Sequence, residues 1–154
     1  MSLSATGFPS ARGWLVDSNV VSELRKGARC DRSVRAWSER VPRVACYISR
    51  LTLAEITFGI ELVTDPGFRA ELEVWIRDGV RPWFGARVLE IDEAVLVQWR
   101  HLDLEGRKAL YTFSQPDALL AATARVHQLA VATRNVQDFV RAGVGILNPW
   151  DEPV

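Results

Sequence analysis

The sequence predicts an α/β fold: a short, mainly parallel central sheet with helices on both faces, giving three layers. Short apolar segments alternate along the chain with longer amphipathic ones. The short segments are apolar throughout, as expected for strands that are covered on both faces. Parallel strands require long connections between them, and the amphipathic segments supply these as helices.

The first half of the chain predicts two strands and three helices. In order they are a strand at 14–16, helices at 20–24 and 33–40, a strand at 44–48 and a helix at 53–63. Asn19 is the expected N-cap of the first helix, and Gly27 is expected to end it. Pro42 separates the second helix from the strand that follows, and Asp65-Pro66-Gly67 ends the third helix.

The second half continues the same alternation. The expected elements are a helix at 68–80, a strand at 87–91, helices at 92–107 and 116–126, a strand at 129–133, a helix at 137–141 and a strand at 144–147. The helix at 68–80 is expected to stop before Pro82. Trp83 and Phe84, next to this proline, are interpreted as core residues.

Length and composition favour one domain. The 154 residues fit a single core, which we expect over 14–150, with a loose N-terminal tail at 1–13 and a C-terminal tail at 151–154. Every stretch of about 18 residues carries charges, which argues against a membrane protein. The N-terminus lacks a basic segment followed by an apolar one, and Cys30 and Cys46 form no metal-binding pattern. These features are typical of a cytoplasmic protein with reduced, packed thiols.

The net charge of zero conceals an uneven distribution. Residues 1–50 carry nine Lys or Arg against four acids, a balance of +5, so the remainder carries −5. A basic segment beside an acidic one suits a protein that meets a phosphate backbone near clustered carboxylates. In particular, Lys26 and the arginines from Arg25 to Arg35 are candidate phosphate contacts. A solvated helical face is the alternative interpretation of this charge.

Four acids lie at junctions between elements, where a parallel sheet gathers its strand ends: Asp17, Glu55, Asp117 and Asp138. For the last three, helix capping is the competing explanation, because each follows a polar residue by three positions. Asp17 precedes its expected cap and lies outside that explanation. If the acids converge, their repulsion requires raised pKa values or divalent cations. Oxygen ligands without cysteine or histidine favour Mg²⁺ or Mn²⁺, which can activate water against a phosphodiester.

At these positions the sequence resembles the PIN-domain family. The segment Leu15–Leu24 is similar to the family's first motif, an Asp followed by Ser or Thr and then Asn. Residues 49–56 and 116–124 resemble the second and third motifs, and the ending from 131 to 150 is similar to that of VapC and FitB-like toxins. The resemblance covers about residues 14–150, and its motifs are specific as an ordered set.

The resemblance implies a PIN fold and a Mg²⁺- or Mn²⁺-dependent endoribonuclease, the toxin of a type II toxin–antitoxin system, which cleaves structured RNA such as tRNA or rRNA. It implies a homodimer, inhibited by a cognate antitoxin protein, with DNA contacted only through that antitoxin. By motif position, Asp17, Glu55 and Asp117 carry over as metal ligands, with Asp17 and Asp117 as the principal pair.

The fourth ligand is open, because many relatives place an acid where this chain has Asn135. It is Asp138, the Asn135 amide oxygen, or absent. Asn19 and Thr133 match polar positions that orient the cluster, with capping as the alternative. Arg134 is a candidate for holding a substrate phosphate, or else it neutralises the acids structurally.

Other function classes fit less well. No GxGxxG or GxxxxGK[ST] motif follows a strand, so a nucleotide-binding module lacks its phosphate cradle. A phosphatase with Asp17 as nucleophile would want a neighbouring acid, and the sequence offers Asn19. His101 and His127 lie within helical patterns, away from the predicted site. The main alternative is a catalytically silent PIN-like domain that acts by binding protein.

Overall fold

A parallel sheet of five short strands forms the centre of the molecule in the computed structural model, which describes residues 11–154. The strands are β1 (Trp14–Val16), β2 (Cys46–Ser49), β3 (Val88–Leu89), β4 (Ala130–Ala132) and β5 (Ile146–Leu147). Their order is β3-β2-β1-β4-β5, and every neighbouring pair is parallel. β1 and β4 are buried along their whole length, as the continuous apolar segments predicted.

Helices connect the strands. The α-helices are α1 (Ser18–Leu24), α2 (Arg32–Arg40), α3 (Arg50–Glu61), α4 (Pro66–Val74), α5 (Arg81–Phe84), α6 (Glu93–Lys108), α7 (Gln115–His127) and α8 (Val136–Phe139). A π-helical segment, η3 (Trp75–Val80), joins α4 to α5. Short 3₁₀ segments are η1 (Gly27–Arg29), η2 (Arg43–Ala45), η4 (Val140–Ala142) and η5 (Pro149–Asp151).

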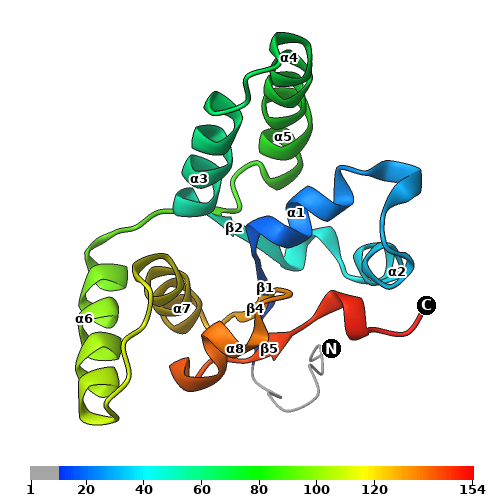
Figure 1. The fold of residues 1–154 in the computed structure, drawn as a ribbon. Coiled ribbons are helices and arrows are strands. Elements are labelled where there is room, and N and C mark those ends of the chain that lie inside the picture. The colour runs from blue at the N-terminus through cyan, green and yellow to red at the C-terminus, as the bar shows by residue number, and fades with distance from the viewer. Residues whose placement is uncertain (1–10) are drawn as a thin grey trace.

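The helices form two layers, one on each face of the sheet. On one face α1 to α5 pack on Trp14, Val16 and Ile48, and on the other α6, α7 and α8 pack on Leu15 and Val131. Figure 1 shows these two groups on opposite sides of the strands, with α6 and α7 apart from α1 and α2. The predicted α/β fold with three layers is confirmed. Every expected strand and helix is present, the strand at 14–16 with the predicted ends and the others with shifted ends.

Two boundaries differ from the prediction for physical reasons. The strand expected at 44–48 begins only at Cys46, because Arg43–Ala45 after Pro42 forms a 3₁₀ turn. The helix expected to stop before Pro82 instead continues to Phe84 and ends at Gly85, which has φ +55°. Pro82 lies in the first turn of α5 behind the wider π-helical turn, where its missing N–H costs little.

The structure describes only part of the predicted N-terminal tail but all of the predicted C-terminal tail. Residues 1–10 of the expected tail lie outside the described residues, whereas the backbone N–H of Arg12 donates to the Gln128 carbonyl at 2.8 Å. At the other end, Arg40 donates to the Pro153 carbonyl at 2.7 Å. Over residues 11–154, no helix combines the length and apolar content needed to cross a bilayer. Cys30 and Cys46 are buried free thiols, and burial raises the pKa of Cys46 to about 11.

Candidate functional site

Asp17 marks the carboxyl end of the central strand. Its backbone N–H donates to the Ala132 carbonyl at 3.0 Å, which fixes Asp17 beside the end of β4. Its carboxylate accepts from the Ser18 N–H at 2.7 Å, so Asp17 itself is the N-cap of α1. The prediction that Asn19 caps this helix is therefore wrong: α1 starts directly after the strand, and Asn19 is already helical.

A buried hydrogen-bond network holds the Asp17 carboxylate. The Thr133 hydroxyl donates to Asp17 Oδ2 at 2.8 Å and accepts from the Asn135 N–H at 3.0 Å. Asn19 Nδ2 lies 3.4 Å from Asp17 Oδ2 and 3.3 Å from Thr133 Oγ1. Asp17 and Thr133 are both buried, so these donors replace the water that an exposed carboxylate would bind. Asn19 and Thr133 thus lie where the sequence placed them, in contact with the first acid.

Glu55 projects from the second turn of α3. This helix begins at Arg50 behind Ser49, whose hydroxyl accepts from the Leu51 N–H at 3.1 Å. The capping interpretation of Glu55 is therefore wrong, since the helix starts earlier than the sequence suggested. Reduced hydration among the surrounding protein atoms raises the pKa of Glu55, and the charges of Asp17 and Asp117 raise it further. The Glu55 carboxylate therefore faces the other acids without a helix terminus to stabilise it.

Asp117 is the third residue of α7 and takes part in its cap. Its backbone N–H donates to Ser114 Oγ at 3.4 Å, and the Ser114 hydroxyl donates to the Asp117 carboxylate. Reduced hydration raises the pKa of Asp117, and the charges of Asp138 and Asp17 add to this, against the lowering effect of Ser114. The predicted capping arrangement and the proximity to other acids are both present here. Ser114, whose position three residues before Asp117 is the signal, was not among the predicted site residues.

Asp138 approaches the same cluster from α8. It is exposed, and its charge reaches Asp117, as the raised pKa of Asp117 shows. Asn135 immediately precedes α8 and makes no side-chain capping bond. Four acids from segments far apart in the sequence thus lie near the carboxyl ends of β1, β2 and β4. The charges of Asp17 and Asp117 act on Glu55, and that of Asp138 acts on Asp117.

The donor set suits an oxygen-preferring divalent cation. Beyond the effect of reduced hydration, the charges of neighbouring carboxylates raise the pKa of Glu55 and of Asp117, so positive charge is favoured at this place. Within residues 11–154, no three His, Cys, Asp or Glu side chains yet stand close enough to enclose an ion. Glu55 and Asp138 are exposed, whereas Asp17 is buried.

Arg134 lies at the edge of the cluster. Its backbone N–H donates to Asn19 Oδ1 at 3.2 Å, which ties it to the network around Asp17. Its guanidinium lies over the Trp150 ring, 5.1 Å from the ring centroid. Within residues 11–154, Arg134 forms no ion pair with any of the four acids. Its charge instead adds to the hydrogen bond from Lys26 in lowering the pKa of Glu23. This arrangement favours the phosphate-holding interpretation over structural neutralisation.

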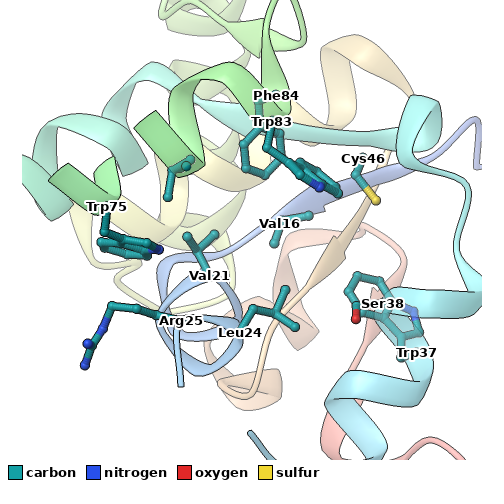
Figure 2. Close-up of a pocket in the computed structure, with 12 residues that line it drawn as sticks. Val16, Val21, Leu24, Arg25, Trp37, Ser38, Cys46, Trp75, Trp83 and Phe84 are labelled. Atoms are coloured by element: carbon teal, nitrogen blue, oxygen red, sulfur yellow. The ribbon is translucent and has the colours of Figure 1, made fainter. Parts of the chain in front are cut away.

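A separate apolar pocket of about 170 Å³ lies between α1, α2 and the η3–α5 segment. Figure 2 shows Trp75, Trp83 and Phe84 around it, with Val16 and Cys46 from the strands and Arg25 at one side. None of the four acids lines it. Phe84 is buried in the core as predicted, whereas Trp83 is only half-buried and faces this pocket.

Comparison with known proteins places this geometry in a family context. The family model described as PIN domain matches residues 14–144. The chain is 33% identical to the VapC ribonuclease Y4jK of Sinorhizobium fredii, over 89% of this chain and 97% of that protein. It is 30% identical to Toxin FitB of Neisseria gonorrhoeae, over 90% of this chain and 99% of that protein. A solved structure of FitAB bound to an IR36 DNA fragment superposes with a TM-score of 0.84 at 28% identity, covering 92% of this chain and 98% of that one.

Proposed function

The chain belongs to the PIN-domain family, and from that premise we propose that it is the ribonuclease toxin of a toxin–antitoxin pair, cleaving structured RNA with Mg²⁺ or Mn²⁺. The observation that carries this proposal is the position of Asp17 after β1, Glu55 in the helix after β2 and Asp117 at the start of α7. They lie near enough for the charges of Asp17 and Asp117 to raise the pKa of Glu55 beyond the effect of reduced hydration. Carboxylates near one edge of a parallel sheet are suited to bind cations and phosphodiesters rather than neutral ligands.

Each acid has a distinct part in this proposal. Asp17 is held rigidly by Thr133 and its own helix, so it supplies the fixed ligand of the cation. Asp117 supplies the second principal ligand, with one oxygen oriented by Ser114. Glu55 completes the ligand set or orients a water molecule, because its exposed position leaves it able to move. When bound, the cation supplies Lewis-acid activation of water and neutralises charge on the phosphodiester.

The partners follow from the same family membership. We propose a cognate antitoxin protein that inhibits the enzyme, a homodimer of this chain, and contact with DNA only through the antitoxin. The similar solved structure is of FitAB bound to an IR36 DNA fragment, which supports a protein partner and an association with DNA. A location in the cytoplasm, where RNA and such complexes are found, is part of the proposal.

The decisive experiment is RNA cleavage by the purified chain. We expect cleavage of a labelled tRNA with Mg²⁺ or Mn²⁺ and none after addition of a chelator. Asp17→Asn and Asp117→Asn should fold but lose at least about 100-fold in rate, since each removes a charged ligand of the cation that would stabilise the transition state. Asp78→Asn is the matched control, because Asp78 is an exposed acid paired only with Arg77. Folded wild-type protein that leaves RNA intact would support the catalytically silent PIN-like domain instead.

The fourth ligand is tested by a pair of variants. We propose Asp138 rather than Asn135, because the charge of Asp138 reaches Asp117. Asp138→Asn should therefore reduce the cleavage rate more than Asn135→Ala does. The opposite order would assign the fourth ligand position to the Asn135 amide. If neither variant changes the cleavage rate, the ligands of the cation are Asp17, Glu55 and Asp117 alone.

A further inference from the structure

We propose that Trp150 is a positioning residue of this nuclease, and that it holds the Arg134 guanidinium to bind an RNA phosphate next to the one that is cleaved. The inference rests on the proposed function and adds a phosphate subsite to it. The juxtaposition behind it is the stacking of Arg134 on Trp150, two residues from separate segments, directly beside the Asp17 network.

Arg134 is anchored by its backbone and exposed at its head. It follows Thr133, which donates to Asp17, and its own N–H is bonded to Asn19. These bonds fix the start of the side chain at the rim of the acid cluster. The guanidinium then extends over Trp150 at the surface.

Arg134 shares ring stacking with other arginines, such as Arg43 on Trp83 and Arg141 on Tyr111. It differs from them in being bonded through its backbone to Asn19, beside Asp17. Arg50, Arg77 and Arg125 are paired with Glu90, Asp78 and Glu105, so carboxylates occupy their N–H donors. Among residues 11–154, Arg134 forms no such ion pair. A ring contacts the face of a guanidinium and leaves its in-plane N–H donors available for two oxygens of a phosphate. Stacking therefore orients Arg134 without competing with an anion.

Trp150 is itself fixed. Its ring packs against the core cluster on the α1 to α5 side of the sheet, and its backbone N–H donates to Asn148 Oδ1 at 3.1 Å. Asn148 Nδ2 in turn donates to Asp151 Oδ2 at 3.0 Å, which closes the turn that carries Trp150. A half-buried indole in a closed turn is a rigid platform, so it restricts the rotamers of the arginine above it.

On the side toward α1, the charges nearest to Arg134 are already paired with one another. Beyond Arg134 lies Glu23, whose pKa is lowered by hydrogen bonds from Lys26 and the Asp31 N–H first, and also by the charge of Arg134. Lys26 Nζ is 2.6 Å from Glu23 Oε2. Lys26 is therefore engaged by Glu23, whereas Arg134 forms no ion pair within residues 11–154 and keeps its guanidinium N–H donors for a phosphate.

The test compares variants in RNA cleavage with Mg²⁺, using a labelled stem-loop RNA at several salt concentrations. Arg134→Ala should raise KM about tenfold, with a smaller change in kcat, because it removes one charge-assisted contact to bound substrate. The slope of log KM against log salt should fall by about 0.7 to 0.9, the value for one phosphate contact. Trp150→Ala should produce part of both changes. Trp150→Phe should keep KM and the salt slope near their wild-type values, because the phenylalanine ring can still stack on Arg134.

The double variant separates positioning from a general structural effect. If Trp150 acts through Arg134, Trp150→Ala should change KM little in the Arg134→Ala background. Arg43→Ala is the matched control: Arg43 lies 5.1 Å over Trp83 at the amino end of β2, and its removal should leave KM and the salt slope unchanged. Thermal unfolding of each variant identifies any loss of fold. If Arg134→Ala does not fold, Arg134→Lys takes its place in the comparison.

Two results would overturn the inference while the wild type still cleaves RNA. One is an unchanged KM and salt slope in folded Arg134→Ala. The other is an equal effect of Trp150→Ala with and without Arg134. A wild type that does not cleave RNA at all would instead remove the proposed function.

Discussion

Thr133 is the residue on which the geometry of the first acid depends most directly. Its hydroxyl is buried, donates to Asp17 at 2.8 Å, and accepts from the Asn135 N–H. Thr133→Val keeps the shape and removes the hydroxyl, leaving two polar groups without their partner. We expect a loss of about 1–3 kcal/mol in unfolding free energy and a loss of RNA cleavage of about 10- to 100-fold, the level of an orienting residue. Thr133→Ser should retain most of both, and wild-type activity in Thr133→Val would show that this bond is dispensable.

The ionised carboxylates of Glu55 and Asp117 are expected to lower the stability of the folded protein, although the proposed function requires them. Their pKa values are raised in the folded protein, so their ionised forms destabilise it, and the penalty grows as pH rises through those values. Without divalent metal, Glu55→Gln should therefore have a higher melting temperature than wild type at about pH 7.5, and the difference should shrink as pH falls toward about 3, below the ordinary pKa of glutamate, where the carboxyl is protonated in both states. Melting curves across this pH range measure it. A Glu55→Gln variant that is less stable at neutral pH would contradict the mutual repulsion of the acids.

At the level of single residues the sequence identified the acids but not how the chain holds them. Asp17 was expected to precede the cap of α1 and is the cap itself. Glu55 was open to a capping interpretation that the start of α3 at Arg50 removes. Trp150 carried no local signal, because its contact with Arg134 joins segments that only the folded sheet brings together.

At a few glycines the backbone of another segment lies so close that a side chain would not fit. Substitutions at these glycines therefore test how the elements pack. A Cβ on Gly13 would collide with the Ala45 carbonyl where β1 begins beside β2. Gly13→Ala should therefore cost about 1–3 kcal/mol of unfolding free energy by overpacking. Gly59 is the control: a Cβ added to it in α3 would meet no other atom within 4 Å, and Gly59→Ala should stabilise by about 0.5–1 kcal/mol. Chemical denaturation measures both, and equal effects would contradict the close approach of β1 and β2.

Element order could be predicted from the alternation of apolar and amphipathic segments, whereas element ends could not. Helix starts depend on which polar side chain reaches a free N–H, and several candidates lay within a few residues of each other. Ser49 rather than Thr52 precedes α3 for this reason. The π-helical turn at Trp75–Val80 left no sequence signal other than the proline behind it.

The whole molecule uses a parallel sheet to gather charges that are scattered along the chain. β1, β2 and β4 end at the same edge, and each is followed by a segment that carries an acid of the cluster. Asp117 arrives by a different route, through α7, which packs beside α6 on the opposite face from α1. Convergence of the acids was expected from parallel topology, and in the folded chain their charges do act on one another. Their part in catalysis is still the proposal.

Binding of Mn²⁺ tests the central claim, that these carboxylates form one site for a divalent cation. The melting temperature of the wild type should rise with Mn²⁺ concentration, by the equivalent of about 2.7 kcal/mol at about 100 times the dissociation constant. Asp17→Asn and Asp117→Asn should lose this rise while remaining folded, and Asp78→Asn should keep it. A wild type whose melting temperature does not respond to Mn²⁺, or an Asp17→Asn, Asp117→Asn double variant that responds fully, would contradict the account.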